Sequence, residues 1–583
     1  MQQFGHRRHY CPNQPAMLAA SDRIVRALAE RFGPDPRVSA WQIDNELGGR
    51  CYCDTCRAAF QDWLERRSES LATLNDVWGT AFWSQTYDAW SQIPLPAVAS
   101  APSGPFGFSR NAPNPGLALD FRRFSSDSLI EFLKLQTKVL RETCDPRQLI
   151  THNLMGFGFS EIDYHALAEE VDIVSWDNYP ILGTGRWVGP ALSGDAMRGL
   201  KRKPVWVLEQ QAGPLGWESF RSPRPGENRL YAWQAVAHGA EIVSFFRWRT
   251  ARFGTEQHWH GIVDANGRLG SRRDEVRALA DELAVVGDAL AGAQPRADVA
   301  MLSDYDSRFA LQVQPTNAAL GYEATVCAHY AALRRLGLGV DVVSTQAPLD
   351  GYPIVVAPSL YVMDESLAAT LTEYVRGGGV LVLAPRTAVK DRCNAIPERP
   401  QPAWLDALAG LEVTDYMSVD PDDRVAIAGE NGAALAGALC GWYERVEPAA
   451  AATLAVYAEG PFAGTPAVTA NLVGDGRAVY LAGVADKAAL RHLYLLLADR
   501  VGLALRDLPT DVEAAALTGE SSELLLLLNY SDEERVVDLG ASDWRARIGV
   551  AAGGRIVLEP QGLALLETER APQPAAPLAD TLP

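Results

Sequence analysis

The sequence predicts an α/β protein that begins with a parallel (β/α) barrel, because three features of residues 1–294 agree. Short apolar runs alternate with segments of helical length, which is typical of parallel strands joined by crossover helices. The runs are apolar throughout, so both faces of the sheet are expected to be covered. Polar residues follow the C-terminal ends of several runs, where (β/α) barrels place their active sites. We therefore expect a catalytic barrel domain over residues 1–294.

The elements of this domain can be assigned in order along the chain. Helical spacing of apolar residues predicts a helix over 16–32, which "GPDP" ends. Residues 57–120 are rich in Trp, Pro, Gly and Asn and are expected to be irregular, and a long helix is expected over 121–143. A closed barrel needs eight strands. The region supplies five predicted strands, at residues 38–44, 149–154, 171–175, 204–208 and 242–247.

Two further domains and a tail are expected after the barrel. Residues 295–507 again alternate strand and helix patterns and predict an open α/β domain of the flavodoxin or amidotransferase type. Three glycines at 377–379 precede a strand, which indicates a helix-to-strand turn, whereas phosphate-binding loops precede a helix. Residues 508–570 alternate short β-rich runs and predict a small β-sandwich, and residues 571–583 predict a disordered tail.

Charge and hydropathy exclude several classes of partner. The formal net charge is −19 at pH 7, which argues against nucleic acid and against anionic membranes as general partners. No apolar run is long enough to span a bilayer. The start, "MQQFGHRRHY", lacks the apolar segment of a secretory signal. The simplest predicted location is the cytoplasm, unless an export signal has been lost upstream.

Two glutamates are the candidate catalytic groups. Glu46 follows "WQIDN" and Glu209 follows "VWVL", so each is expected at the C-terminal end of a barrel strand. A close carboxylate pair serves glycoside hydrolysis, with one group as proton donor and the other as nucleophile or base. The alternative is structural, with each Glu capping a helix or pairing with an arginine. Tryptophans that could stack on a sugar recur near strand ends, at Trp41, Trp176, Trp206, Trp217, Trp248 and Trp259.

Four of the eight cysteines form a candidate metal site. Cys51, Cys53 and Cys56 have the spacing C-x-C-x2-C, and Cys11 can supply a fourth thiolate. In a reducing compartment such a cluster favours a metal ion over disulfides. Four thiolates close a tetrahedron around Zn²⁺ and leave no open position, so we expect a structural zinc site. The alternative is four unliganded thiols.

Six motifs, in order along residues 7–264, resemble the family 42 glycoside hydrolases, which are β-galactosidases with a zinc-bearing barrel. They are "RRHYC", "WQIDNE", "CYCDTC", "DIVSWDNYP", "VLEQQAGPLGW" and "FRWR…EQHWHGIVD". The resemblance implies hydrolysis of terminal non-reducing β-D-galactosides with retention, through a covalent glycosyl-enzyme intermediate. It also implies a homotrimer that is built partly by the middle domain.

The resemblance also implies roles for individual residues. Glu46 matches the general acid/base and Glu209 the nucleophile, which predicts carboxyl groups about 5 Å apart. The substrate-binding residues it implies are Arg8, Asn45, Trp217, Glu256 and a histidine, either His258 or His260, of which "WHG" favours His260. One departure from the family is the short gap between Glu46 and Cys51, which could distort the zinc site.

The position of the acid/base motif raises a question about the barrel. The resemblance places Glu46 at the end of the fourth barrel strand, yet only 37 residues precede the predicted strand at 38–44. We therefore expect a barrel that lacks about its first three βα units, as in a truncated gene product, a late start or half of a split protein. The alternative functions are another retaining glycosidase, acting on α-L-arabinopyranosides, β-fucosides or β-glucosides, and an inactive remnant that only oligomerises.

Overall fold

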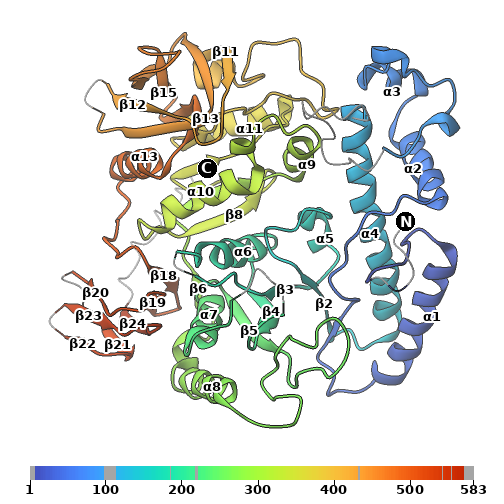
Figure 1. Ribbon diagram of the computed structural model, residues 1–583, viewed down its shortest axis with the longest axis vertical. Coiled ribbons are helices and arrows are strands. Elements are labelled where there is room, and N and C mark those ends of the chain that lie inside the picture. The colour runs from blue at the N-terminus through green and yellow to red at the C-terminus, as the bar shows by residue number, and fades with distance from the viewer. Residues whose placement is uncertain are drawn as a thin grey trace, which may run out of the picture.

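The computed structural model arranges the chain as a half-barrel, a central mixed-sheet domain and a small β domain (Figure 1). Within the ranges given below, no helix is both long and apolar enough to cross a lipid bilayer. The residues that the structure describes are 5, 7–96, 113–183, 185–216, 221–430, 433–540, 543–552 and 554–569. Trp217 and the expected disordered tail at 571–583 lie outside these residues.

The catalytic half of the chain contains a parallel half-barrel sheet of five strands in sequential order. All four neighbouring pairs are parallel, and the first and last strands form its edges. Parallel sheets are usually covered on both faces, partly by their crossover helices, which explains why the strands are apolar throughout. The strands are β1 (Ala40–Gln42), β2 (Leu149–Leu154), β3 (Ile173–Asn178), β4 (Val205–Gln211) and β5 (Ala240–Phe246). Each of the five predicted strands is therefore present.

Helices connect and cover these strands. The long helix α4 runs from Pro115 to Thr143 and begins six residues before its predicted start, because the Asn114 side chain accepts hydrogen bonds from the Gly116 and Leu117 backbone N–H groups. Asp163 caps α5 in the same way. Apart from α2 and α3, described below, the α-helices of this half are α1 (Pro15–Phe32), α4 (Pro115–Thr143), α5 (Tyr164–Ala168), α6 (Val188–Gly199), α7 (Glu227–Ala237) and α8 (Ser271–Leu290).

The expectation that residues 57–120 are irregular is wrong. Two helices occupy part of this range, α2 (Asp54–Arg67) and α3 (Leu71–Val77). Their buried aromatic residues, with those of α4, form a separate small core, which explains why tryptophan is frequent here. The four clustered cysteines border this core. Short 3-10 turns at Phe82–Ser84 and Trp90–Gln92 complete the unit.

The central domain contains an 11-stranded mixed sheet. Its parallel part has the order β8 (Val340–Ser344), β7 (Val299–Ser303), β9 (Ile354–Ala357), β10 (Val380–Leu383) and β16 (Gly476–Leu481). This order is compatible with a flavodoxin-type arrangement, which stays a prediction. The helices of the domain are α9 (Tyr305–Val313), α10 (Tyr322–Arg334), α11 (Glu365–Arg376), α12 (Asp406–Ala409) and α13 (Lys487–Arg500). The glycines at 377–379 end α11 and lead into β10, as predicted.

An antiparallel extension of this sheet was not predicted. Its strands pair in antiparallel fashion, and β13 pairs with three neighbours. These strands contain exposed as well as buried residues, so their sequences are less uniformly apolar than those of the parallel strands. A strand is therefore harder to recognise in them. The extension comprises β11 (Leu411–Ser418), β12 (Arg424–Gly429), β13 (Ala436–Pro448), β14 (Ala452–Tyr457), β15 (Pro466–Val473) and β17 (Gly483–Ala485).

The C-terminal domain consists of two antiparallel sheets. The larger has the order β21-β24-β19-β18-β6, and its last member, β6 (Gln294–Pro295), comes from the linker after the barrel helix α8. The smaller has the order β20-β23-β22. Their bounds are β18 (Val512–Thr518), β19 (Ser522–Asn529), β20 (Arg535–Asp538), β21 (Arg545–Ile548), β22 (Ala551–Ala552), β23 (Arg555–Leu558) and β24 (Leu563–Glu569).

Candidate active site

Glu46 lies in the loop directly after β1, and the backbone of the neighbouring strand holds this loop in place. The N–H of Ile43 still donates to the carbonyl of Thr151 on β2 (2.9 Å). Asp44 and Glu46 then adopt φ values of 51° and 44°, in the left-handed region that non-glycine residues rarely use. Such residues persist where the surroundings fix them, and they concentrate at functional sites. The Glu46 side chain is thereby turned to the C-terminal end of the sheet.

Asn153, at the end of β2, is the amide that fixes Glu46. Its side-chain oxygen accepts a hydrogen bond from the Glu46 backbone N–H (3.0 Å) and another from Gln42 Nε2 (3.0 Å). Its Nδ2 group lies within hydrogen-bonding distance of Asn45 Oδ1 (3.0 Å), Asp177 Oδ2 (2.8 Å) and Glu209 Oε1 (3.3 Å). Asn153 is fully buried. One side chain therefore connects the ends of four parallel strands.

Glu209 lies in β4, and Tyr179 approaches it from the end of β3. The Tyr179 hydroxyl donates a hydrogen bond to Glu209 Oε2 (2.5 Å). Burial raises the pKa of Glu209 above its ordinary value, while the Tyr179 hydrogen bond acts in the opposite direction and Glu46 adds to the rise. Burial and the nearby Glu209 carboxylate raise the pKa of Tyr179, so its hydroxyl keeps its proton.

Three carboxyl groups meet at this point. One carboxylate oxygen from each of Glu46, Asp177 and Glu209 lies within 4.8 Å of the other two. Asp177 and Glu209 face each other in the register of β3 and β4. Glu46 is buried and Glu209 half-buried. A pair of carboxyls this close fits the geometry of retaining glycoside hydrolysis, in which the two groups lie about 5 to 5.5 Å apart.

Two arginines from the N-terminal loop supply positive charge to the cluster. Arg7 forms an ion pair with Glu46, and Arg8 Nη2 lies 3.2 Å from the same Glu46 oxygen. Arg8 also contacts the sulfur of Met155 (3.6 Å). Asn45 precedes Glu46, and its oxygen lies 3.4 Å from Gln42 Nε2. The structure thus brings Arg8 and Asn45, which the resemblance implies as substrate residues, next to the carboxylate cluster.

A loop after β5 carries the remaining implied substrate residues. Glu256 forms an ion pair with Arg247, and its charge contributes to the raised pKa of Glu209, so the loop faces the carboxylate cluster. The backbone N–H of His260 donates to the Pro214 carbonyl (3.0 Å), which ties this loop to the segment after β4. His258 is exposed and packs near Gly216, whereas His260 is half-buried.

Of the six tryptophans predicted near strand ends, those that the structure describes lie in different environments. Trp176 is buried in the main core, so it packs behind the sheet. Trp41 donates to Gln148 Oε1 (2.7 Å), and Trp248 is exposed. Trp259 packs edge-on against Tyr179, with ring centroids 4.7 Å apart. Trp259 therefore contacts the tyrosine that donates a hydrogen bond to Glu209.

Sequence reasoning missed four residues of this site. They are Asp177, Arg7, Asn153 and Tyr179, none of which is among the candidate residues predicted from the sequence. All but Arg7 lie at or just after the ends of β2 and β3, and parallel strands bring such ends to one edge of the sheet. That rule, applied to every predicted strand, would have found the three.

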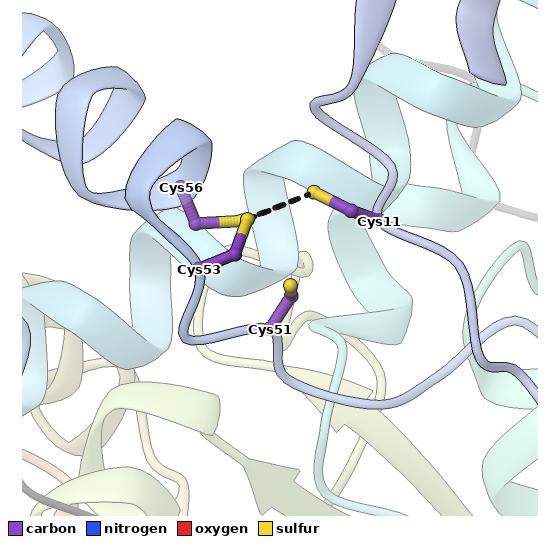
Figure 2. Close-up of side chains that lie close together, drawn as sticks. All are labelled: Cys11, Cys51, Cys53 and Cys56. Atoms are coloured by element: carbon purple, nitrogen blue, oxygen red, sulfur yellow. Dashed lines mark hydrogen bonds between the residues drawn. The ribbon is translucent and has the colours of Figure 1, made fainter. Parts of the chain in front are cut away.

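The four clustered cysteines converge from two segments, the loop before α1 and the turn into α2 (Figure 2). The sulfur of Cys11 lies 3.3 Å from that of Cys56 and 3.7 Å from that of Cys53. All four sulfurs lie within 4.8 Å of one another. A tetrahedral Zn²⁺ ion with four sulfurs at about 2.3 Å places those sulfurs about 3.8 Å apart. The donor set and its spacing therefore fit zinc.

The thiols of this cluster shift one another's pKa values. Hydrogen bonds from Cys11 and Cys56 hold the pKa of Cys51 well below its ordinary value, and the pKa of Cys56 is raised in return. Because Zn²⁺ binds thiolates, its binding would displace the protons that the thiols of this cluster carry. Cys144, Cys327, Cys393 and Cys440 lie outside this cluster.

Comparison with family models gives two matches that follow one another along the chain. A model described as "Beta-galactosidase" matches residues 1–286. A model described as "Beta-galactosidase trimerisation domain" matches residues 297–504. Together they cover the half-barrel and the central domain.

Several characterised relatives are similar over most of their length. A β-galactosidase from Alicyclobacillus acidocaldarius, BglY, is 34% identical over 589 residues, which cover 97% of this chain and 82% of the relative. A β-galactosidase from Thermus sp., BgaA, is 38% identical over 522 residues, which cover 84% and 77% of the two chains.

Solved structures of β-galactosidases are also similar to this chain. The β-galactosidase from Bacillus circulans sp. alkalophilus superposes with a TM-score of 0.91 at 31% identity, covering 97% of this chain and 84% of that one. The enzyme from Halorubrum lacusprofundi gives 0.89 at 33% identity, covering 98% and 85%. The carboxylate pair at the sheet edge, the two family models and these relatives lead to one conclusion: the chain belongs to glycoside hydrolase family 42, the β-galactosidase family.

Proposed function

We propose that the chain hydrolyses terminal non-reducing β-D-galactosides with retention of configuration. The observation that carries the proposal is the carboxyl pair Glu46 and Glu209, which has one oxygen of each group within 4.8 Å of the other. Inverting enzymes separate their carboxyls by about 6.5 to 9.5 Å to admit a water molecule, so this spacing supports retention. Membership of a family whose named relatives are β-galactosidases supports galactose as the sugar.

The reaction follows from the surroundings of the two glutamates. Glu209 attacks the anomeric carbon as a carboxylate, which the Tyr179 hydroxyl stabilises by its hydrogen bond. Glu46 gives its proton to the leaving glycosidic oxygen, and the covalent galactosyl ester forms on Glu209. Glu46 then takes a proton from water, the water oxygen attacks the anomeric carbon, and galactose leaves with the β configuration restored.

The sugar would be held by polar groups around the pair. Arg8 and Asn45 adjoin Glu46, so they are suited to bind hydroxyls next to the reacting carbon. Glu256 and His260, on the loop after β5, are assigned to the hydroxyls at the far side of the ring. Trp217 is assigned to the stacking face on the family resemblance alone.

The zinc site is a second part of the proposal. Cys11, Cys51, Cys53 and Cys56 would hold Zn²⁺ as thiolates, with no position left for substrate. The ion would tie the loop that carries Arg7 and Arg8 to the turn that follows Glu46. Its contribution is therefore to order the substrate side of the site, and no chemical step passes through it.

Assembly and location complete the proposal. The match of residues 297–504 to a trimerisation-domain model supports a homotrimer, which sedimentation equilibrium of the purified protein would test. A reducing compartment such as the cytoplasm suits metal-binding thiolates, and we propose that location.

The central experiment is a substrate panel with variants of the nucleophile. We expect release of nitrophenol from p-nitrophenyl β-D-galactopyranoside to exceed that from the β-glucoside, the β-fucoside and the α-L-arabinopyranoside. Glu209→Ala should lower kcat at least about a thousandfold, because the covalent step is lost. Glu241→Ala is the matched control, since Glu241 is exposed on β5 of the same sheet and should leave kcat unchanged. Equal activity of Glu209→Ala and the parent would overturn the proposal.

A further inference from the structure

His152 lies on β2, and its ring contacts both ends of the short loop that carries Glu46. Its Nδ1 atom lies 2.6 Å from the carbonyl oxygen of Ile43. The backbone N–H of Leu47 donates a hydrogen bond to its Nε2 atom (3.0 Å). Glu46 lies between these two contact points along the chain. A single imidazole therefore bridges the start and the end of this loop.

The two contacts determine which nitrogen carries the hydrogen. A backbone carbonyl can only accept a hydrogen bond, so the Nδ1 atom that faces Ile43 must be the donor. A backbone N–H can only donate, so the Nε2 atom that faces Leu47 must be unprotonated. The bridge therefore requires one tautomer of the neutral imidazole. A second proton would turn Nε2 into a donor that faces another donor, which would break the bridge.

The surroundings of the ring keep it neutral. His152 is only 1% exposed, and burial lowers the pKa of its ring below the ordinary value. The charge of Arg8 acts in the same direction. The Ile43 carbonyl and the charges of Asp44 and Glu46 oppose this shift. Because burial has the largest effect, the imidazole carries no charge near neutral pH.

The bridge begins where the backbone pairing of the two strands ends. The last paired residues of β1 and β2 are Gln42 and Thr151. The next two residues of β2 are His152 and Asn153, and the Asn153 side chain accepts a hydrogen bond from the Glu46 N–H (3.0 Å). Successive side chains of a strand point to opposite faces of the sheet. The two side chains therefore hold the loop from both faces.

The position of both partners distinguishes His152 from a histidine that only completes a core. Its two partners belong to the five-residue segment 43–47, one on each side of Glu46. In this segment Asp44 and Glu46 have φ values of 51° and 44°, a conformation that persists only where the surroundings fix it. The bridge supplies such a constraint.

We propose that His152 is a positioning residue whose neutral ring holds the loop 43–47 in the conformation that places the Glu46 carboxyl beside that of Glu209. The inference rests on the proposed function for its catalytic consequence, because that function makes Glu46 the acid/base. His152 acts through the backbone of the loop. Its loss would let the loop relax, so proton transfer by Glu46 should weaken while attack by Glu209 stays largely intact.

Leaving groups of different acidity test this role. Phenol is a weak acid, so phenyl β-D-galactopyranoside needs a proton from Glu46 to lose its leaving group, whereas 2,4-dinitrophenolate leaves without one. We expect His152→Leu to lower kcat/KM for the phenyl galactoside by about tenfold or more, and kcat/KM for the 2,4-dinitrophenyl galactoside by at most about threefold. Equal losses on both substrates, or no loss on either, would overturn the positioning role.

Two further variants separate positioning from folding. His152→Gln keeps a donor and an acceptor but has one more rotatable bond, so it should fold and show a smaller difference between the substrates. If His152→Leu does not fold, the absence of any difference in His152→Gln overturns the role. His329→Leu is the matched control, since His329 is also buried and lies 2.6 Å from the Tyr494 hydroxyl, but on α10 of the central domain. It should leave the ratio of the two kcat/KM values unchanged.

Two measurements on the free protein keep this inference distinct from the proposed function. Solid-state NMR of the sedimented parent, labelled with ¹⁵N at histidine, should show a neutral Nδ1–H ring that His152→Gln lacks. Amide hydrogen exchange of residues 43–47 should be slow in the parent and faster in the His152 variants. A charged ring, the other tautomer, or exchange that the variants leave unchanged overturns the inference whether or not the chain is active. An inactive parent that passes both measurements would sink the proposed function and leave the bridge supported.

Discussion

At the scale of single residues, the site depends on side chains that hold the proposed catalytic pair, Glu46 and Glu209. Asn153 is the clearest example, since it touches Glu46, Asn45, Asp177 and Glu209 and is itself shielded from water. Its backbone belongs to β2, so its position is set by the sheet and not by a loop. A site held by strand residues is more precisely ordered than one built from loops alone.

Tyr179 should set the pH at which the nucleophile becomes active. Its hydroxyl stabilises the ionised form of Glu209, so it lowers the pKa of that group. In Tyr179→Phe this hydrogen bond is lost, the pKa of Glu209 rises, and a higher pH is needed to ionise the nucleophile. We expect the acid limb of kcat/KM to move up by about one pH unit, measured with a nitrophenyl galactoside.

Tyr374→Phe provides the control for this shift. The Tyr374 hydroxyl also donates a hydrogen bond, to the Tyr352 carbonyl (2.9 Å), but it lies in the central domain. Its loss should leave the acid limb where it is. An unmoved limb in Tyr179→Phe would mean that the hydroxyl does not stabilise the nucleophile.

The two glutamates could each be placed at a strand end from sequence, whereas their contacts with Asp177 and the other partners could not. Glu46 and Glu209 each follow an apolar run, so their positions at strand ends can be inferred locally. Asp177 also follows such a run, but its proximity to both glutamates depends on the register of β3 with β4, including a bulge between Trp176 and Asp177. Periodicity carries no information about such a bulge.

At the scale of elements, strands with apolar residues on both faces were predictable and helices in a mixed composition were not. The strand β2 was predicted with the bounds that it has, 149–154. Helix α2 was missed because its average composition is polar and only one narrow side is buried, at Cys56, Phe60, Trp63 and Leu64. Those four residues form one core with Leu117, Phe121 and Phe124 of α4, which lie more than 50 residues further along the chain.

The unit formed by α2 and α3 should depend on the proposed zinc ion. Cys56 lies in the first turn of α2 and is only 1% exposed. Without the zinc ion, water could not reach its sulfur to solvate it. We expect the native protein to contain one zinc ion per chain by mass spectrometry of metals, and Cys56→Ala to lose it. Amide hydrogen exchange in residues 54–77 should then rise, while exchange in β7 to β10 stays unchanged.

Cys144→Ala is the matched control for zinc binding, since Cys144 lies outside the four-sulfur cluster. It should retain the ion and the slow exchange of α2. Native protein without zinc, whose exchange is insensitive to a chelator, would contradict the prediction.

At the scale of the whole molecule, a buried charge cluster joins the three domains. Glu513 on β18 accepts hydrogen bonds from Arg334 Nη2 on α10 (2.9 Å) and from His238 Nε2 after α7 (2.8 Å). His238 contacts Asp195 on α6 through its other nitrogen (2.8 Å). The exposed fraction of these side chains is at most 4%. Each domain thus contributes a charge that another domain neutralises.

The pKa values of this cluster fix the pH range in which it stabilises the fold. Burial alone would lower the pKa of His238, but Asp195 and Glu513 raise it above its ordinary value. Its contribution is therefore complete below about pH 6.5 and is lost as the pH rises through the raised pKa. Burial would raise the pKa of Glu513, yet His238 and Arg334 hold it at about 2. That contribution is complete above the ordinary pKa of a glutamate, about 4.3, and is lost as the pH falls towards 2.

Glu513→Gln should accordingly weaken the contacts between the three domains. The substitution leaves Arg334 and His238 buried with an uncompensated charge, which typically costs about 3 to 5 kcal/mol. We expect the first transition of urea-induced unfolding to move to lower denaturant, most clearly between about pH 5 and 6.5, where both His238 and Glu513 contribute fully in the parent. The difference from the parent should shrink as the pH rises and His238 loses its proton.

An exposed ion pair of the C-terminal domain is the control for Glu513→Gln. Glu533 lies 2.7 Å from Arg535, but three quarters of its side chain is exposed to solvent. Water screens such a pair, so Glu533→Gln should change the free energy of unfolding by at most about 1 kcal/mol at any pH. If the two variants unfold alike across the pH range, the buried cluster does not hold the domains together. A loss confined to Glu513→Gln, with the stated pH dependence, assigns that role to the charges that meet at Glu513.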